Sequence, residues 1–376
     1  MKDYLNEGNR THFIFPIDGD YLNKRDGERD ELGALITVCA SSETSCRVRI
    51  NGAYATERSG IYYASVHIPM GESVITAVNE DNGDCESITV YYSESYDGKY
   101  RISSDDNILF LADITEKKDS YSSIFDNPYL AVYKKAHDLF QAKVHLNLFY
   151  EFDSEAATHF SESRPYFNLS MMTDKFKVEW TENSDWLKLS FHARGEFPDK
   201  PYNYAEGRTI VSDYLDVRRE VLRFAGEECF SEDVTTVHWG EANTECVRAL
   251  QEYGLRALTG YFELDEGGEP LVSYYAPLPL TLHIGERDFF RDREMGVTFG
   301  RIDRVTNIGT LDEIMRDMEY ITRHRGRGGF VSFMIHEQYF YPDYENYLSD
   351  FDERVLAPAR LLFEKGYTGA HVKEVI

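Results

Sequence analysis

Ile108-Leu-Phe-Leu-Ala-Asp-Ile114 and Leu187-Lys-Leu-Ser-Phe-His-Ala193 are the two stretches that indicate how this chain folds. Each is an apolar run that ends near a side chain able to bind a metal ion, Asp113 in the first and His192 in the second. Such runs are typical of buried strands that give way to a loop. In an α/β barrel the carboxyl ends of the strands meet on one face, so these two side chains are expected to lie close together. A third such strand, residues 329–335, delivers His336 and Glu337.

The first 99 residues consist of short segments in which apolar and polar residues alternate. Turn residues separate nearly all of the segments, which cover residues 12–16, 34–39, 46–50, 60–68, 73–79 and 86–92. Asn51-Gly52 and Asp81-Asn-Gly83 are hairpin signals, because Asn and Gly tolerate positive φ. This spacing, without a helical period, predicts an antiparallel β-sandwich over residues 1–99.

From residue 100 onward, apolar runs alternate with amphipathic helical patterns. Helices are expected at residues 128–140, 210–224, 244–253, 311–324 and 351–365, and strands at 108–113, 143–150, 186–192, 234–239, 257–262, 296–302 and 329–335. The alternation predicts a distorted β/α barrel of about seven strands over residues 100–376. Residues 264–294 are interpreted as an insertion over the barrel. The predicted fold class is therefore multidomain, with a β-sandwich followed by a β/α barrel.

Length, charge and cysteine content limit the classes of function. A chain of 376 residues favours two domains. The formal net charge of -26 argues against nucleic acid or an anionic membrane as a partner. The five cysteines show no CxxC spacing, which argues against a zinc–cysteine site and favours free thiols. Without an apolar leader or spanning segment, the expected location is cytoplasmic by default, or secreted if a leader has been removed. The oligomeric state is left open.

Leu111-Ala-Asp-Ile-Thr115, His192-Ala-Arg-Gly-Glu196 and Ser332-Phe-Met-Ile-His-Glu337 follow one another in the order of the motifs of a known family. The order of elements over residues 101–376 resembles the polysaccharide deacetylases of the NodB homology type. In that family a distorted β/α barrel binds a divalent metal through one Asp and two His. Residues 48–75 resemble the immunoglobulin-like accessory modules of carbohydrate-active enzymes.

The resemblance implies a metal site made by Asp113, His192 and Glu196, with zinc as the expected ion. The first strand of the family ends in a paired Asp-Asp, and Asp113 takes the place of the metal-binding carboxylate. The catalytic-base position then falls on Ala112, which cannot accept a proton. Glu196 stands where the family has its second His.

The later motifs supply the candidate catalytic residues. Thr236-Val-His-Trp-Gly-Glu-Ala-Asn243 stands where the family carries a loop that shapes the active-site groove, which makes His238 and Glu241 candidates. His336 matches the general acid at the end of the last barrel strand. Glu337, Glu241 or His238 is left to supply the base. Asp303 also follows a predicted strand and is a further candidate for the cleft.

The function implied by the resemblance is metal-dependent hydrolysis of an N- or O-acyl group on a carbohydrate or another acylated small molecule. Two alternatives stay open. One is a divergent barrel that binds carbohydrate or protein without catalysis. The other is a metal-independent glycoside hydrolase that uses two carboxylates among Asp113, Glu151, Glu241 and Glu337.

Overall fold

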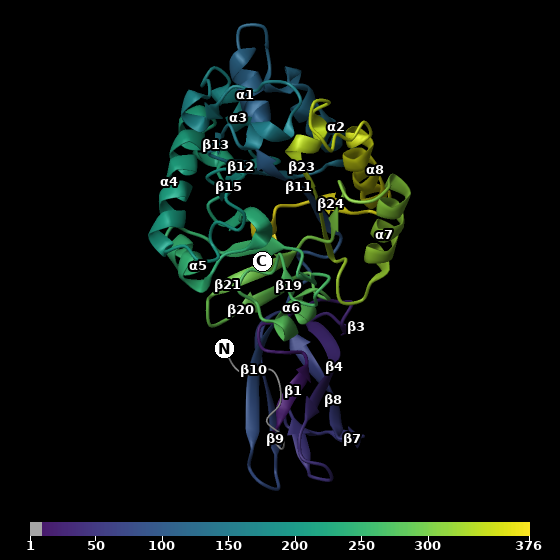
Figure 1. The fold of residues 1–376 in the computed structure, drawn as a ribbon. Helices are drawn as coiled ribbons and strands as arrows, with labels where there is room; N and C mark the ends of the chain where they lie inside the picture. The colour runs from purple at the N-terminus through teal and green to yellow at the C-terminus, as the bar shows by residue number, and fades with distance from the viewer. Residues whose placement is uncertain (1–9) are drawn as a thin grey trace.

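The computed structural model describes residues 10–376 as a mixed α/β molecule with several sheets, none of them closed. The N-terminal strands form the narrow lower part of Figure 1, and helices surround the wider upper part. Among residues 10–376, no helix has the length and apolar character needed to cross a bilayer.

Two five-stranded sheets of the N-terminal region share one core. The first contains β1 (His12–Phe15), β3 (Gly27–Arg29), β4 (Gly33–Ser41), β7 (Thr56–Arg58) and β8 (Ile61–Pro69), and the second contains β2 (Tyr21–Leu22), β5 (Val48–Ile50), β6 (Ala53–Tyr54), β9 (Gly71–Asn79) and β10 (Cys85–Tyr92). Apolar side chains of both sheets, such as Ile36 and Ile75, belong to one buried cluster. Asn51 and Gly52 adopt positive φ between β5 and β6, as the hairpin signal predicts. The six strands predicted in this region are confirmed in position.

Two further sheets are largely parallel. The larger has the order β15 (Leu187–Ala193), β12 (Val144–Phe149), β11 (Lys99–Asn107), β23 (Phe330–His336), β22 (Arg304–Val305), with β24 (Thr368–Gly369) beside β11. The smaller has the order β16 (Val234–Thr235), β17 (Ala257–Gly260), β21 (Val297–Arg301), β20 (Phe289–Asp292), of which β20 is antiparallel. β12, β21 and almost all of β23 are buried, as expected for parallel strands covered on both faces. Two short pairs, β13 (Glu151–Phe152) with β14 (Phe167–Asn168) and β18 (Glu263–Leu264) with β19 (Pro270–Leu271), complete the strands of the described chain.

The helices lie on the outside of these sheets, with α4 on the left of Figure 1 and α7 and α8 on the right. Within the described residues they are α1 (Leu109–Glu116), α2 (Pro128–Phe140), α3 (Lys177–Glu182), α4 (Gly207–Phe224), α5 (Thr244–Gln251), α6 (Leu278–Ile284), α7 (Leu311–Arg323) and α8 (Phe351–Glu364). Side-chain caps fix several starts: the Asn127 amide oxygen accepts the Leu130 N–H, and Thr310 and Glu313 form a capping box. The five predicted helices are confirmed, with ends that differ by up to three residues.

The predicted strand at residues 108–113 is wrong, because this apolar run forms most of helix α1. The strand is β11, directly before it, and its side chains are buried although many are polar. Hydrogen bonds replace apolar contacts there: the Arg101 guanidinium donates to Ser332 Oγ and Thr259 Oγ1, and Ser104 Oγ lies 2.6 Å from Tyr129 OH. An apolar period cannot identify a strand of this kind. The predicted strand at 234–239 is also shorter than expected, because a 3₁₀ turn begins at His238.

Aromatic contacts and buried ion pairs attach the N-terminal sheets to the rest of the molecule. The rings of Tyr96 and Phe289 meet edge to face with centroids 5.3 Å apart. Arg287 Nη1 lies 2.7 Å from Asp26 Oδ1, and both side chains are almost completely buried. Truncating either partner of such a pair would leave an uncompensated buried charge, so the loss of Arg287 or Asp26 is expected to destabilise this junction.

Candidate metal centre

The carboxyl ends of the parallel strands meet at one cavity of about 820 Å³. β11 supplies Asp105 and Asp106, β15 supplies His192, and β23 supplies His336. His238 follows β16 and completes this set. In the parallel pairing of β11 with β23, Asp105 is the partner of His336, which brings residues from distant parts of the sequence to the same edge.

A break in the regular strand directs two neighbouring carboxylates to the same cavity. In a regular strand, adjacent side chains point to opposite faces of the sheet. The register of β11 with β12 shifts between Ser104 and Asn107, and Asp106 has a φ of 60°. Both Asp105 and Asp106 line the cavity. Irregularities of this kind are frequent beside functional sites, where they redirect a side chain.

Three possible metal ligands converge at the centre of the cavity. Asp106 Oδ1 lies 3.1 Å from His192 Nε2 and 3.4 Å from His238 Nδ1, and the two ring nitrogens are 3.1 Å apart. A tetrahedral ion about 2.0–2.1 Å from each ligand atom requires ligand atoms roughly 3.3–3.4 Å apart. This Asp-His-His group is buried and can hold a divalent metal, and it is the one group of its kind that residues 10–376 contain.

Backbone carbonyls fix the direction in which each ring presents its lone pair. His192 Nδ1 lies 2.5 Å from the Thr236 carbonyl oxygen, and His238 Nε2 lies 3.0 Å from the Glu196 carbonyl oxygen. A carbonyl only accepts, so each of these nitrogens carries the proton. In the neutral rings, the other two nitrogens are therefore bare and face each other beside the Asp106 carboxylate. Three acceptors at this spacing need a cation or a shared proton between them, and outer contacts of this kind are typical of metal-binding histidines.

The electrostatics of the group also favour a cation. Burial raises the pKa of Asp106, but His336, His192 and His238 outweigh burial and hold that pKa well below its usual value. Burial lowers the pKa of His192, but Asp105 and Asp106 outweigh burial and the net pKa is raised. The Asp106 carboxylate therefore stays ionised at neutral pH and attracts positive charge. Gln338 Nε2 donates to Asp106 Oδ2 at 2.9 Å and holds the carboxylate in place.

This raised pKa predicts opposite effects of pH on metal-free and zinc-loaded protein. The pKa of His192 is higher in the folded chain than in free histidine, about 6.5. Its contribution to the free energy of unfolding is therefore complete below about pH 6.5 and disappears as pH rises through the folded pKa. Zinc competes with the same proton, so its stabilisation grows with pH.

The measurement is the melting temperature of the wild type and of His192→Gln between about pH 6 and 9, with chelator or with Zn²⁺. The difference in melting temperature between the wild type and His192→Gln should become smaller with rising pH in chelator and larger with rising pH in Zn²⁺. If this difference changed with pH in the same direction in both buffers, His192 would not be the residue at which zinc replaces a proton.

Asp113 and Glu196, two of the three ligands expected from the sequence, are not members of the Asp-His-His group. Asp113 lies on α1, where its carboxylate contacts Lys117 Nζ at 2.6 Å, Tyr121 OH at 2.8 Å and Asn127 Nδ2 at 2.7 Å. Asp113 was expected at the end of a strand and in the cavity. It lies instead on helix α1 and does not line the cavity. Glu196 does line the cavity, and burial and the charge of Asp106 raise the pKa of its carboxyl to about 8.

Two of the four candidate catalytic residues line the cavity, His238 and His336. His238 joins Asp106 and His192, and His336 Nε2 lies 3.9 Å from Asp106 Oδ2. Asn307 Oδ1 accepts a hydrogen bond from His336 Nδ1 at 2.8 Å. The other ring nitrogen, Nε2, is therefore the one that can interact with groups in the cavity.

Glu337 and Glu241 line none of the three cavities described here. The Glu337 carboxylate accepts the N–H groups of Ile108, Leu109 and Phe110 and the hydroxyl of Tyr341. It therefore caps the start of α1, where four N–H groups lack partners within the helix. Glu241 is buried elsewhere, with Lys200 Nζ 3.8 Å from its Oε1.

Asp105 and Asp106 line the cavity but are not among the residues predicted from the sequence. A signal was present in the sequence, because two adjacent Asp residues are the pattern that the resemblance leads one to expect at the end of the first strand. The run at residues 108–114 is more apolar than β11, and this run predicted the pair at Ala112 and Asp113 instead. The second histidine was likewise sought four residues after His192, whereas His238 comes from the next strand end.

A smaller pocket of about 230 Å³ adjoins the centre and shares Asp106, Glu196 and Trp239 with the larger cavity. Phe149, Phe152 and Phe160 form part of its apolar wall. Glu151 also lines it, alone among the four carboxylates considered for a glycoside hydrolase. No two of those four carboxylates therefore line the same one of the three cavities described here.

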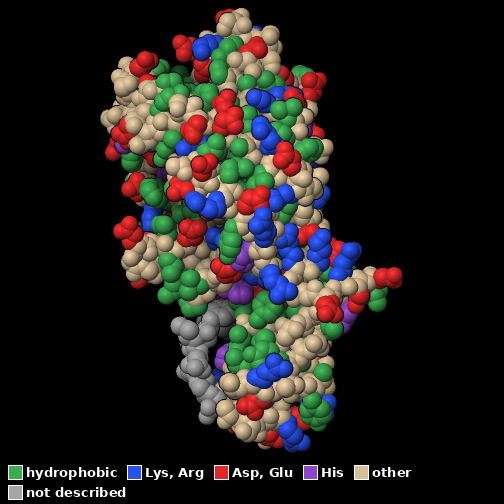
Figure 2. Space-filling model, turned by 90° about the vertical axis from the view of Figure 1, so that its right-hand side faces the viewer, with side chains coloured by type: hydrophobic (Ala, Val, Ile, Leu, Met, Phe, Trp, Pro, Cys, Tyr) green, Lys and Arg blue, Asp and Glu red, His purple; other side chains and the backbone are tan. Residues whose placement is uncertain are grey.

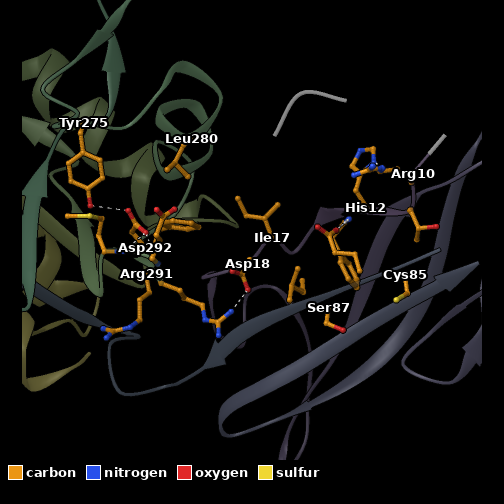
Figure 3. Close-up of a pocket in the computed structure, with 18 of the residues that line it drawn as sticks. Arg10, His12, Ile17, Asp18, Cys85, Ser87, Tyr275, Leu280, Arg291 and Asp292 are labelled. Carbon is orange, nitrogen blue, oxygen red and sulfur yellow. Dashed lines mark hydrogen bonds and ion pairs between the residues drawn. The ribbon is translucent and has the colours of Figure 1, made fainter. Parts of the chain in front are cut away.

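Another cavity, of about 860 Å³, lies between the N-terminal sheets and the region of α6 and β20 (Figure 3). Two of its polar contacts are an ion pair, with Arg293 Nη1 2.8 Å from Asp18 Oδ1, and a hydrogen bond that Tyr275 OH donates to Asp292 Oδ2 at 3.0 Å. No member of the Asp-His-His group lines it. This cavity is larger than the one at the strand ends, but the described residues that line it include no group of side chains that could hold a metal ion.

No protein-family model matches the chain, and no curated protein matches it. Among solved structures, it is similar to a proposed polysaccharide deacetylase involved in O-antigen biosynthesis from Bordetella bronchiseptica, with 10% identity, a TM-score of 0.32, and coverage of 73% of this chain and 85% of the other. It is also similar to a proposed α-galactosidase from Bacteroides fragilis, with 10% identity, a TM-score of 0.24, and coverage of 96% and 80%. TM-scores of this size carry no argument about activity, so the functional conclusion rests on the geometry of the centre.

Proposed function

We propose that this chain is a metal-dependent hydrolase of the polysaccharide deacetylase type, which removes an N- or O-acyl group from a carbohydrate. The observation that carries the proposal is the spacing of Asp106 Oδ1, His192 Nε2 and His238 Nδ1, at 3.1, 3.1 and 3.4 Å. Three protein ligands leave one position of a tetrahedral ion open for water or substrate.

Zinc is the first choice of metal, because two imidazoles and one carboxylate form a common catalytic zinc site. The same set of ligands also suits Fe(II), so the test includes other divalent ions. A bound divalent metal would supply Lewis acidity, which polarises an acyl carbonyl and makes water more acidic.

Asp105 is the proposed general base, in place of the inert Ala112. It is buried beside Asp106, lines the cavity, and accepts a hydrogen bond from Asn147 Nδ2 at 2.5 Å. A carboxylate held in this way can take a proton from the attacking water. His336 is the proposed general acid, since its Nε2 faces the cavity and can protonate the leaving amine or alcohol.

Trp239 supports a carbohydrate substrate. Its side chain is 41% exposed and lines both the cavity and the smaller pocket. An aromatic ring that remains accessible next to a polar centre offers a stacking surface for a sugar.

We also propose the finer architecture that this function requires. The two parallel sheets would form one distorted β/α barrel over residues 100–376, and residues 1–99 an immunoglobulin-like sandwich. A parallel bridge joins Leu189 of β15 to Phe230, which precedes β16. The Asp303 N–H, just after β21, donates to the carbonyl of Ser332 on β23 at 2.7 Å. These two links lie where the sheets would have to meet for closure.

The test is acetate release from a panel of acetylated sugars and from 4-nitrophenyl acetate. The protein is stripped with chelator and then reloaded with Zn²⁺, Co²⁺ or anaerobic Fe²⁺. We expect activity to disappear on stripping and to return with at least one of the ions. Activity that survives complete metal removal, or a lack of activity in all loaded forms, would contradict the proposed function.

A further inference from the structure

The cavity continues past the Asp-His-His group into a second part lined by arginines. We call this part the arginine lobe and define it by Tyr261, Arg301, Asp303, Arg304 and Arg327, all of which line the cavity. Tyr261 follows β17 and Arg301 ends β21, so these two residues stand at carboxyl ends of strands, as the metal ligands do. The lobe and the metal centre are therefore two parts of one binding space.

Several polar atoms of the lobe are buried without a hydrogen-bond partner. Tyr261 OH and Arg327 Nε are two of them. Arg301 Nε and Asp303 Oδ1 are two more, and these atoms are 3.9 Å apart, too far for a direct hydrogen bond. A buried polar group without a partner is unfavourable, so such groups usually have a partner when the site is occupied.

The spacing of Arg301 and Asp303 suits a hydroxyl group. The guanidinium is a donor and the carboxylate an acceptor, and a sugar hydroxyl can accept from the first and donate to the second. Asp303 Oδ2 already accepts the Ser332 N–H at 2.9 Å, which leaves Oδ1 as the oxygen for a ligand. A cavity of about 820 Å³ is large enough for a sugar ring in addition to the acyl group.

The charges of the lobe favour an anion. The lobe holds three arginines and one buried carboxylate, Asp303, which lies beside Arg301. The side chain of Arg304 is 17% exposed, whereas its partner Asp317 is 49% exposed. Exposed carboxylates compensate buried guanidiniums weakly, because water screens the pair. Burial lowers the pKa of the Arg301 guanidinium, the charge of Asp303 raises it, and the charge of Arg327 lowers it again, which shows that Arg327 and Arg301 repel each other. On the face shown in Figure 2, Lys and Arg side chains gather in a band across the middle, although the whole chain carries a net charge of -26.

We propose that the arginine lobe binds a sugar residue with a negatively charged substituent, a carboxylate or a phosphate. The anionic group contacts Arg304 and Arg327, Tyr261 OH donates to the same sugar, and a ring hydroxyl bridges Arg301 Nε and Asp303 Oδ1. The proposal rests on the proposed hydrolase function and names its substrate class, an acylated acidic glycan.

The test measures binding without hydrolysis, on chelator-treated protein, by isothermal titration or ligand-observed NMR. The probes are methyl glucuronide, glucose 6-phosphate, methyl glucoside and inorganic phosphate. We expect a charged sugar to bind at least about tenfold more tightly than methyl glucoside, as one charge-assisted hydrogen bond would give. Preference for the glucuronide or for glucose 6-phosphate identifies the anionic group.

Arg327→Gln should remove most of this preference, whereas Arg325→Gln, the same change at an exposed position of the same loop, should leave it intact. Tyr261→Phe should weaken sugar binding without lowering the melting temperature, because the hydroxyl has no partner in the free protein.

Equal binding of glucuronide, glucose 6-phosphate and glucoside, no binding of any sugar, or equal effects of the two arginine variants would overturn the proposal. Tight binding of inorganic phosphate without preference among the sugars would also overturn it. Acetate release without a preference for charged sugars would contradict the proposed substrate class and leave the proposed hydrolase function intact. Preferential binding of charged sugars without acetate release would contradict the hydrolase function and support the anion-binding role of the lobe.

Discussion

Asp106→Asn is expected to abolish stoichiometric metal binding. Asp106 Oδ1 contacts both ring nitrogens of the centre, and its carboxylate is the negative charge of the group. An amide keeps the size of the side chain but removes that charge. Loss of an outer partner of a metal ligand already weakens affinity by about 10–100-fold, so loss of a direct ligand should exceed about 100-fold. Metal content after purification without chelator and a Zn²⁺ titration measure the effect.

The matched control is Asp113→Asn, the same change at the ligand that the apolar run in the sequence suggested. Asp113 is paired with Lys117, Tyr121 and Asn127 on the outside of the centre, so its loss should lower stability and leave the metal bound. Zinc should still raise the melting temperature of this variant, since a ligand at 100 times its dissociation constant adds about 2.7 kcal/mol. The reverse pattern, metal lost in Asp113→Asn and retained in Asp106→Asn, would overturn the assignment of the centre.

Apolar periodicity predicted the elements that bury apolar side chains. Examples are α2, which begins at Pro128 behind an Asn cap, and β12 and β23, which are buried along almost their whole length. The prediction assumes that the apolar residues of a helix or strand lie on the faces that are buried in the fold, and these segments meet that assumption. Of the three metal ligands predicted from the sequence, Asp113, His192 and Glu196, only His192 belongs to the Asp-His-His group in the structure.

The site could not be predicted by the same rule, because β11 is buried through hydrogen bonds. Arg101, Ser104 and Asp105 find partners on neighbouring strands and helices, and a sequence alone does not show those partners. Functional sites commonly break the local rules in this way. The positive φ of Asp106 and the 3₁₀ turn at His238 are further local departures, and both position a side chain of the centre.

Asp105→Asn is expected to keep the metal and lose the chemistry. Asparagine has nearly the same shape as aspartate, but its amide cannot accept the proton of the attacking water. Removal of a general base typically lowers the rate by about 10²–10⁴-fold, and the loss should fall on kcat with little change in KM. Acetate release from the substrate identified in the panel, with metal content measured on the same sample, separates this effect from loss of the metal centre.

Glu241→Gln is the matched control, since Glu241 is a buried carboxylate that the sequence suggested as a base but that lines none of the cavities described here. It should retain activity within a few-fold, because a proton acceptor must lie within hydrogen-bond reach of the reacting water. Full activity in Asp105→Asn together with loss in Glu241→Gln would move the base to Glu241. Loss of metal from Asp105→Asn would instead make Asp105 part of the metal site, and the strand end would then hold two ligands rather than a ligand and a base.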